Sequence, residues 1–137
     1  MSIDIKYDQN RKVLDVIISG KSDIDEFTSA LEKITRSAEY PPDTCAIWDI
    51  RNSDLSNVNF QLISEIVKIR SRFTERSNCR SALIVSSNAQ YGLSRMFEML
   101  SEGKIPHQFM VFRDYKEGEQ WLLKNKLIET GIFSNFN

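Results

Sequence analysis

Alternating hydrophobic and polar positions open the chain and predict a β-hairpin. Ile3, Ile5 and Tyr7 alternate with charged residues, which is typical of a strand that buries one face. The polar stretch 8–11 predicts a turn, and the apolar residues of 13–18 fall on both faces of a second strand. We expect these two strands to pair antiparallel.

A helix and then three strand–loop–helix units follow the hairpin. Each unit has a short apolar run, a polar loop, and then apolar residues at helical spacing. The predicted strands are 44–50, 81–85 and 108–112, and the predicted helices cover about 23–38, 59–73, 88–100 and 114–122. Capping residues support two helix starts, because Asp23 precedes Glu26 and Asp114 precedes Glu117 at the expected spacing.

The helical spacing also predicts which residues of the two central helices face the core. The first of these helices should bury Leu62, Ile66, Ile69 and Phe73, with Ile63 and Val67 beside them. The second should bury Leu93, Met96, Phe97 and Leu100. Tyr91 and Met99 are expected to be exposed enough to line a pocket or an interface.

The order of the elements predicts an α/β fold with a single domain over residues 1–137. It implies a five-stranded mixed sheet, with an antiparallel N-terminal hairpin, parallel crossovers and about four helices. Sheets of this kind place binding crevices beyond the carboxyl ends of the parallel strands. The segment 124–137 is apolar enough to pack on the body or on a partner. We expect self-association, as a homodimer, through this tail (Phe133 and Phe136) or through the edge strand 3–7.

Composition narrows the class of protein. The chain has 137 residues, 41% of them hydrophobic, and a formal net charge of −1, which favours neither nucleic acid nor an anionic membrane. The N-terminus lacks the features of a signal peptide, and no apolar run is long enough to span a bilayer. Cys45 and Cys79 show no metal-type spacing and are expected to be reduced thiols. We therefore expect a cytoplasmic protein.

Four polar loops should gather at the carboxyl edge of the sheet, namely 20–23, 51–58, 86–90 and 113–114. Together with the strand ends and the following helix, they supply candidate ligand- or partner-binding residues, which are Asp49, Arg51, Asp54, Ser86, Ser87, Asn88, Gln90, Tyr91, Arg95 and Arg113. The start of the third helix suits an anion because its free N–H groups carry a positive dipole end. Alternatively, Ser87 or Asn88 simply caps that helix.

The other patterns at this edge also leave alternatives open. Asp49 and Arg51 project to the same face and predict either a structural ion pair or a ligand site. The spacing of Asp49 and Asp54 matches no known metal loop, so no metal site is predicted. His107 lies at the opposite edge, and the chain has no phosphate loop, CxxC or HExxH motif. We expect neither enzymatic activity nor a cofactor.

Three stretches of the chain resemble proteins of the SpoIIAA-like family, which includes STAS domains and relatives grouped with Sec14-type lipid-binding domains. These are 47–51 with Asp54 and Ser56, 89–98, and 111–114 with Trp121 and Leu122. They are similar to stretches of small bacterial STAS-like proteins. The resemblance covers roughly Ile3 to Leu123.

The resemblance implies a non-enzymatic regulatory module. STAS domains of the anti-sigma-factor antagonist type bind a kinase partner and are switched by phosphorylation of a serine in a D-S-S/T-G-like motif. The corresponding stretch here is 54–58, in which Ser56 is the nearest match and Ser53 the second, although no second serine and no glycine follow. Ser56 and Ser53 are therefore candidate phosphorylation sites.

Two functions follow as hypotheses, and a third possibility, an enzyme that uses Asp49, Asp54 or Ser56, would need a carboxyl group with a raised pKa in a closed cleft. In the first, the protein binds a protein partner through the loop 49–59 and the face of the following helix. In the second, it binds a small molecule or lipid in a pocket at the carboxyl edge, between the turn 86–95 and the two central helices. A partner surface requires exposed apolar residues on a helix, whereas a ligand carrier requires a pocket of roughly 300 Å³ or more.

Overall fold

The computed structural model describes residues 1–41, 44–73, 80–105 and 108–129, without the side chains of 125–129. These residues form five strands and four helices in the order β1 (Ser2–Asp8), β2 (Val13–Lys21), α1 (Ile24–Arg36), β3 (Cys45–Asp54), α2 (Phe60–Ser71), β4 (Ser81–Ile84), α3 (Asn88–Ser101), β5 (Phe109–Phe112) and α4 (Tyr115–Glu129). Cys79, His107, Phe133 and Phe136 lie outside the described residues.

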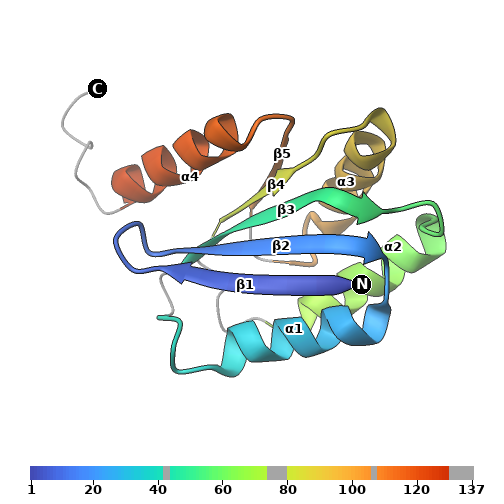
Figure 1. Ribbon diagram of the computed structural model, residues 1–137, viewed down its shortest axis with the longest axis horizontal. Helices are drawn as coiled ribbons and strands as arrows, with labels where there is room; N and C mark the ends of the chain where they lie inside the picture. Colours follow the sequence, from blue (N-terminus) through green and yellow to red (C-terminus); the bar gives the residue numbers. More distant parts are fainter. Residues whose placement is uncertain (42–43, 74–79, 106–107, 130–137) are drawn as a thin grey trace.

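The strands form a single mixed sheet in the order β1-β2-β3-β4-β5 (Figure 1). β1 pairs antiparallel with β2, and the other neighbours are parallel. The predicted α/β architecture is therefore confirmed. The helix starts also agree with the sequence, because the side chains of Asp23, Asn59 and Ser87 accept backbone N–H bonds at the N-termini of α1, α2 and α3.

The helices divide the hydrophobic core between the two faces of the sheet. On one face, Leu31 and Ile34 of α1 pack with Trp48 of β3, and half-buried residues of α2 and α3 join them. On the other face, Leu122 of α4 packs on Ile47 and its neighbours in β3 and β4. Figure 1 shows α4 and α1 on opposite sides of the sheet.

The third strand is longer than its apolar run predicts. We expected it to end at Ile50 and a loop to cover 51–58, but β3 continues to Asp54. β2 likewise continues through Gly20 to Lys21, which pairs with Asp54 beyond a register shift near Ile17. Backbone hydrogen bonds hold this extension together, so its polar side chains give no strand signal. The loop after β3 is therefore only 55–59.

The predicted buried faces of α2 and α3 are partly wrong. In α2 the buried residues are Ile63, Val67 and Arg70, whereas Leu62, Ile66 and Ile69 are only half-buried. In α3 the buried residues are Gln90, Ser94 and Ser101, and the expected core residues Leu93, Met96, Phe97 and Leu100 are half-buried. These helices contact each other as well as the sheet, which rotates their buried faces away from the purely apolar stripe.

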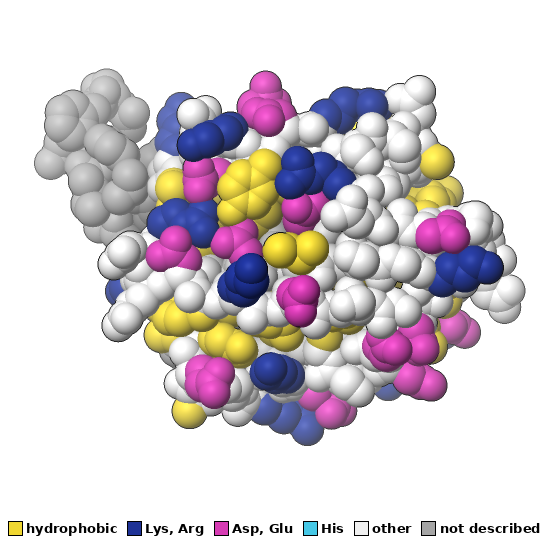
Figure 2. Space-filling view, viewed as in Figure 1, with side chains coloured by type: hydrophobic (Ala, Val, Ile, Leu, Met, Phe, Trp, Pro, Cys, Tyr) yellow, Lys and Arg dark blue, Asp and Glu magenta, His cyan; other side chains and the backbone are white. Residues whose placement is uncertain are grey.

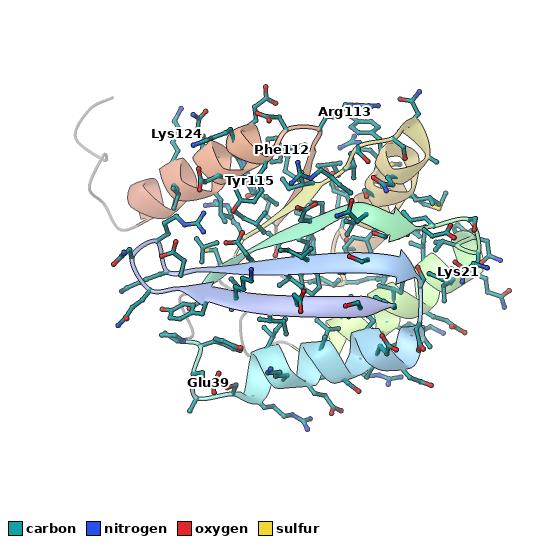
Figure 3. All side chains as sticks on the ribbon, in the orientation of Figure 1. Lys21, Glu39, Phe112, Arg113, Tyr115 and Lys124 are labelled. Carbon is teal, nitrogen blue, oxygen red and sulfur yellow. The ribbon has the colours of Figure 1, made fainter. Side chains whose placement is uncertain are left out.

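An ionic network that the sequence analysis did not identify joins the β1–β2 turn to α4. Arg11 forms ion pairs with Asp8 (Nε–Oδ2 2.6 Å), Asp15 (Nη2–Oδ2 2.7 Å) and Glu119 (Nη1–Oε2 2.5 Å). Tyr115 donates a hydrogen bond from its hydroxyl to Asp15 Oδ1 at 2.5 Å. Tyr115 lies where α4 meets the sheet (Figure 3). We call these five residues the Arg11 network.

Candidate functional site

The structure brings most of the predicted site residues to the carboxyl edge of the sheet, where β3, β4 and β5 end and α3 begins. Ser86 and Ser87 belong to the short connection between β4 and α3, and Asn88 and Gln90 already belong to the helix. The connection is therefore 85–87, and the predicted loop 86–90 extends three residues too far into the helix. Arg113 follows β5 directly and lies near α3 (Figure 3).

Asp49 and Arg51 form the structural ion pair that was one of the two alternatives. Arg51 donates from Nε to Asp49 Oδ1 at 2.9 Å and from Nη2 to Oδ2 at 2.8 Å. These hydrogen bonds lower the pKa of the Asp49 carboxyl below its ordinary value and raise that of Arg51. Asp49 is therefore held as a carboxylate with a fixed partner, which leaves Arg51 as the more exposed member of the pair.

Gln90 connects three of the chain segments at this edge. Its side chain is buried and donates from Nε2 to the carbonyl oxygens of Arg51 and Ser53, each at 3.2 Å. Its Oε1 accepts hydrogen bonds from the backbone N–H and the hydroxyl of Ser86. Because both polar groups of the amide bind the protein itself, Gln90 holds the extended end of β3 against the start of α3.

Arg113 connects the β5–α4 loop to the first turn of α3. Its Nη2 donates to Asn88 Oδ1 at 2.8 Å, and its guanidinium lies over the ring of Tyr91, 4.8 Å from the centroid. Arg95, one helical turn after Tyr91, pairs instead with Glu98 (2.9 Å) within α3. Ser87 is the N-cap, with its hydroxyl accepting from Gln90 N–H at 3.1 Å, so the capping alternative holds for this residue.

The two candidate phosphorylation sites lie in different surroundings. Ser56 is exposed in the turn between β3 and α2, where its N–H donates to Asp54 Oδ1 at 3.0 Å. Hydrogen bonding from Ser56 lowers the pKa of the Asp54 carboxyl. Ser53 is half-buried within β3 and donates its hydroxyl to the carbonyl of Ile50 at 2.6 Å. Of the two hydroxyls, that of Ser56 is the more accessible.

An apolar cavity of about 140 Å³ lies beneath the loop after β3, between the sheet and α1, α2 and α3. Leu55 and Val58 of the loop form part of its lining, and Trp48 and Leu83 contribute from the sheet. The helices supply Phe27, Ile63, Ile66, Arg70, Leu93, Ser94 and Phe97. The expected pocket between the turn 86–95 and the two central helices was therefore only partly right, because α1 and the sheet also enclose the cavity.

Three large hydrophobic side chains are exposed among the described residues, and all lie on the neighbouring helices α2 and α3. Phe60 is 61% exposed, Met99 is 66% exposed and Tyr91 is 36% exposed. Phe60 lies seven residues, nearly two helical turns, before the buried Val67, so both project from the same side of α2. Phe60 was not among the residues that the sequence predicted for either face of this helix, and its spacing to Ile63 and Val67 gives no sign that it is exposed.

Neither a metal cluster nor a membrane-spanning helix is found among the described residues. The described residues contain no group of three or more His, Cys, Asp or Glu side chains that could hold a metal ion. No helix among them is both long enough and apolar enough to cross a membrane. Many polar side chains of the edge bind one another, and its exposed groups include the cations of Arg51 and Arg113 and the carboxylates of Asp54 and Asp114.

Comparison with solved structures finds this architecture in an uncharacterised protein of the DUF3478 family from Shewanella loihica PV-4, described as having a SpoIIAA-like fold. The TM-score is 0.55, the sequence identity is 22%, and the match covers 88% of this chain and 92% of that chain. No protein-family model and no curated protein matches the sequence. At this identity the likeness establishes the fold alone, and the fold that the resemblance implied is confirmed.

Proposed function

We propose that this protein of SpoIIAA-like fold is a non-enzymatic interaction module. Its partner, a protein, would bind the loop 55–59 after β3 together with the first turn of α2 and the exposed side of α3. The observation that carries the proposal is the position of Phe60, Tyr91 and Met99, the exposed large hydrophobic residues of the described chain, on these two adjacent helices. We call this area the α2–α3 surface.

The α2–α3 surface has the composition of a protein interface. Burying a side chain such as Phe60 in a partner contributes about 1.5–3 kcal/mol, and aromatic and Arg residues are the commonest energetic centres of interfaces. The exposed Arg95 lies one turn from both Tyr91 and Met99 along α3. Exposed polar residues of the loop, among them Ser56 and Asn57, would form the rim.

The protonation state of the carboxyl edge supports a non-enzymatic role. A carboxylic acid that acts in catalysis near neutral pH usually has a raised pKa. The pKa values of Asp49 and Asp54 are instead lowered, by hydrogen bonds from Arg51 and Ser56 respectively. Both groups are therefore stable anions at neutral pH, with neighbours that stabilise the charge.

Phosphorylation of Ser56 would regulate this surface. The hydroxyl is exposed in the turn that leads to Phe60, and a phosphate would add about 1.5–2 negative charges next to the Asp54 carboxylate. Like-charge repulsion would open the turn, and the new charge would disfavour an acidic partner. Ser53 is the second candidate, because its hydroxyl is half-buried and bonded to a carbonyl.

Site-specific photocrosslinking in cells that produce the protein tests the partner surface. A photoreactive amino acid at Phe60 or Met99 should yield a discrete heteromeric adduct, and one at the exposed Lys124 of α4 should not. Adding Phe60→Ser should reduce the Met99 adduct at least roughly fivefold, which corresponds to about 1 kcal/mol of lost binding energy. Equal adducts at all three positions, or none at Phe60 and Met99, would refute the proposal.

A second function is favoured by the apolar cavity, which would receive a small apolar ligand or the end of a lipid chain. Its volume of about 140 Å³ is below that of an ordinary ligand pocket, so a ligand would have to be small or enter only in part. An apolar cavity of comparable size in another protein stays dry and binds benzene. The loop residues Leu55 and Val58 contribute to the lining, and the loop's movement would admit the ligand.

A substitution that fills the cavity tests ligand binding independently of partner binding. Ser94 is buried and lines the cavity, so Ser94→Leu should raise the free energy of unfolding by about 0.5–2 kcal/mol and abolish the benzene-induced rise in Tm. Ala89→Leu, at an exposed position of the same helix, should change neither the stability nor the response to benzene.

Mass spectrometry of the native and then the denatured protein from its own cells provides the second measurement, since an adduct lost on denaturation identifies a bound small molecule. A wild-type protein that gains no stability from benzene would exclude the cavity as a binding site.

A further inference from the structure

The outer side of β1 is a regular strand edge. β1 is the first strand in the sheet order, and its seven residues pair with β2 without a register shift. It contains no proline and no glycine. The opposite edge strand, β5, has only four residues, and very short edge strands are one of the ways in which proteins avoid edge pairing. β1 therefore presents a long and continuous row of backbone groups on its outer side.

The side chains of β1 alternate between charge and hydrophobicity. Ile3, Ile5 and Tyr7 project toward α1 and are partly buried there, whereas Asp4 and Lys6 are exposed on the other face. Among the described residues neither Asp4 nor Lys6 has an ion-pair partner. Figure 2 shows a hydrophobic strip between rows of charged side chains in the region where Figure 1 places β1 and α1.

A groove continues this edge toward the helix layer. The groove is open to solvent and has a volume of about 570 Å³. Its lining residues are Ile3, Asp4 and Ile5 of β1 and Asp25, Glu26, Ser29, Ala30 and Lys33 of α1. The groove leaves space for the side chains of a strand added beside β1. An added strand would cover the remaining exposed surface of Ile3, Ile5 and Tyr7.

The sequence of β1 is complementary to itself in the antiparallel register that pairs all seven residues of the strand. Residues directly opposite each other in an antiparallel pair share one face of the sheet. The polar and apolar faces of the two strands therefore match only when the twofold axis lies midway between the two copies of one residue. An axis at Asp4 or at Lys6 would place two like charges opposite each other. An axis at Ile5 instead places Asp4 opposite Lys6 of the second copy, twice, and Ile3 opposite Tyr7, twice.

We propose that the protein forms a homodimer by antiparallel pairing of β1 with β1 of a second copy, with the twofold axis at Ile5. The two five-stranded sheets would then form one continuous ten-stranded sheet across the dimer. The dimer would use the edge opposite β5, so it leaves the α2–α3 surface accessible, and the proposal does not depend on the function proposed above.

Charge complementarity selects a second copy over an unrelated peptide. The outer face of β1 carries one acid and one base in alternation, which a uniformly basic or acidic strand would match at only one of the two positions. A second copy matches both positions and also supplies the apolar residues for the face toward α1. The interface is therefore isologous, as expected for a closed twofold dimer.

Charge exchange tests the register directly. Asp4→Lys places lysines opposite one another at both charge pairs, and Lys6→Asp does the same with aspartates, so each variant should weaken the dimer at least roughly tenfold in sedimentation equilibrium. The double variant Asp4→Lys/Lys6→Asp restores opposite charges and should dimerise like the wild type. An equimolar mixture of the two single variants should form a heterodimer, because every pair then has opposite charges.

Circular dichroism provides the folding control. Both substituted residues are exposed, so the substitutions should leave the fold unchanged.

A wild-type protein that stays monomeric at millimolar concentration would overturn the proposal. Single variants that dimerise as tightly as the wild type would do so as well, and so would a mixture that does not associate. If Phe133→Ser/Phe136→Ser dissociates the dimer and Asp4→Lys does not, the tail is the interface and β1 is not. A monomer that binds octalysine through β1, with the binding lost in Asp4→Lys, would assign this edge to a basic peptide and also overturn the dimer.

Discussion

Gly118→Ala should lower the free energy of unfolding by about 1–2 kcal/mol, although alanine is the better helix former. Gly118 is buried in α4, and a Cβ there would lie 2.5 Å from Ile84 Cδ1 and 3.2 Å from Phe112 Cδ2. Ile84 is fully buried, so its terminal methyl can move only by displacing other core atoms. Overpacking should therefore exceed the gain of about 1 kcal/mol from helix propensity.

The matched control for this substitution is Gly92→Ala in α3. Gly92 is exposed, and a Cβ there meets no atom within 4 Å, so only the helix propensity changes. This variant should be more stable than the wild type by about 0.5–1 kcal/mol. Urea denaturation measures both differences. Stabilisation by both substitutions would show that α4 can move away from β4 without cost, which contradicts the close packing of this helix.

Arg11→Met should be the second strongly destabilising change, by about 2 kcal/mol at pH 7. Methionine keeps most of the apolar stem but removes the guanidinium, which leaves the carboxylates of Asp8, Asp15 and Glu119 close to one another without their shared cation. The residues of the Arg11 network are partly exposed, so the loss should be smaller than for a fully buried pair. Arg95→Met removes a single more exposed pair within α3 and should cost less than about 0.5 kcal/mol.

The effect of Arg11→Met should depend on pH. Hydrogen bonds from Arg11 lower the pKa of Asp8 in the folded protein below its ordinary value of 3.8. A depressed folded-state pKa contributes stability above the unfolded value, and that contribution is lost as the pH falls through 3.8 and below. The stability difference between wild type and Arg11→Met should therefore shrink between pH 7 and pH 3, as chemical denaturation at each pH would show. A difference that stays constant across this range would mean that packing, and not charge, stabilises the network.

The element order could be derived from the sequence because it depends on local patterns. The alternation of Ile3, Ile5 and Tyr7 with charged residues has the period of a strand, and side-chain caps such as Asp23 and Asn59 act within three residues of the backbone that they bind. The location of the candidate site at the carboxyl edge also followed, because parallel strands necessarily end on the same side. The Asp49–Arg51 pair was among the predicted alternatives since both residues project from one face of a strand.

Other parts of the site depend on contacts between distant segments and have no local signal. The length of β3 is set by its ladder with β2, in which Ser19, Gly20 and Lys21 pair through backbone groups regardless of side-chain polarity. Gln90 looked like a surface ligand because amides usually are exposed, yet it is buried where three segments meet. Phe60 matches the buried stripe of α2 in spacing but is exposed in the first turn of the helix.

The sequence by itself determined the α/β fold class, the hairpin, the parallel crossovers and the edge that carries the candidate site, because hydrophobic period and capping chemistry act over a few residues. The Arg11 network could be recognised only in the tertiary structure, because its members Asp15 and Tyr115 are far apart in the chain. The same holds for the cavity, because three helices and the sheet contribute to its lining. The tertiary structure also decided which apolar residues remain uncovered on α2 and α3. Burial is a property of the whole packing arrangement, since a side chain is covered only by the neighbours that the fold brings to it.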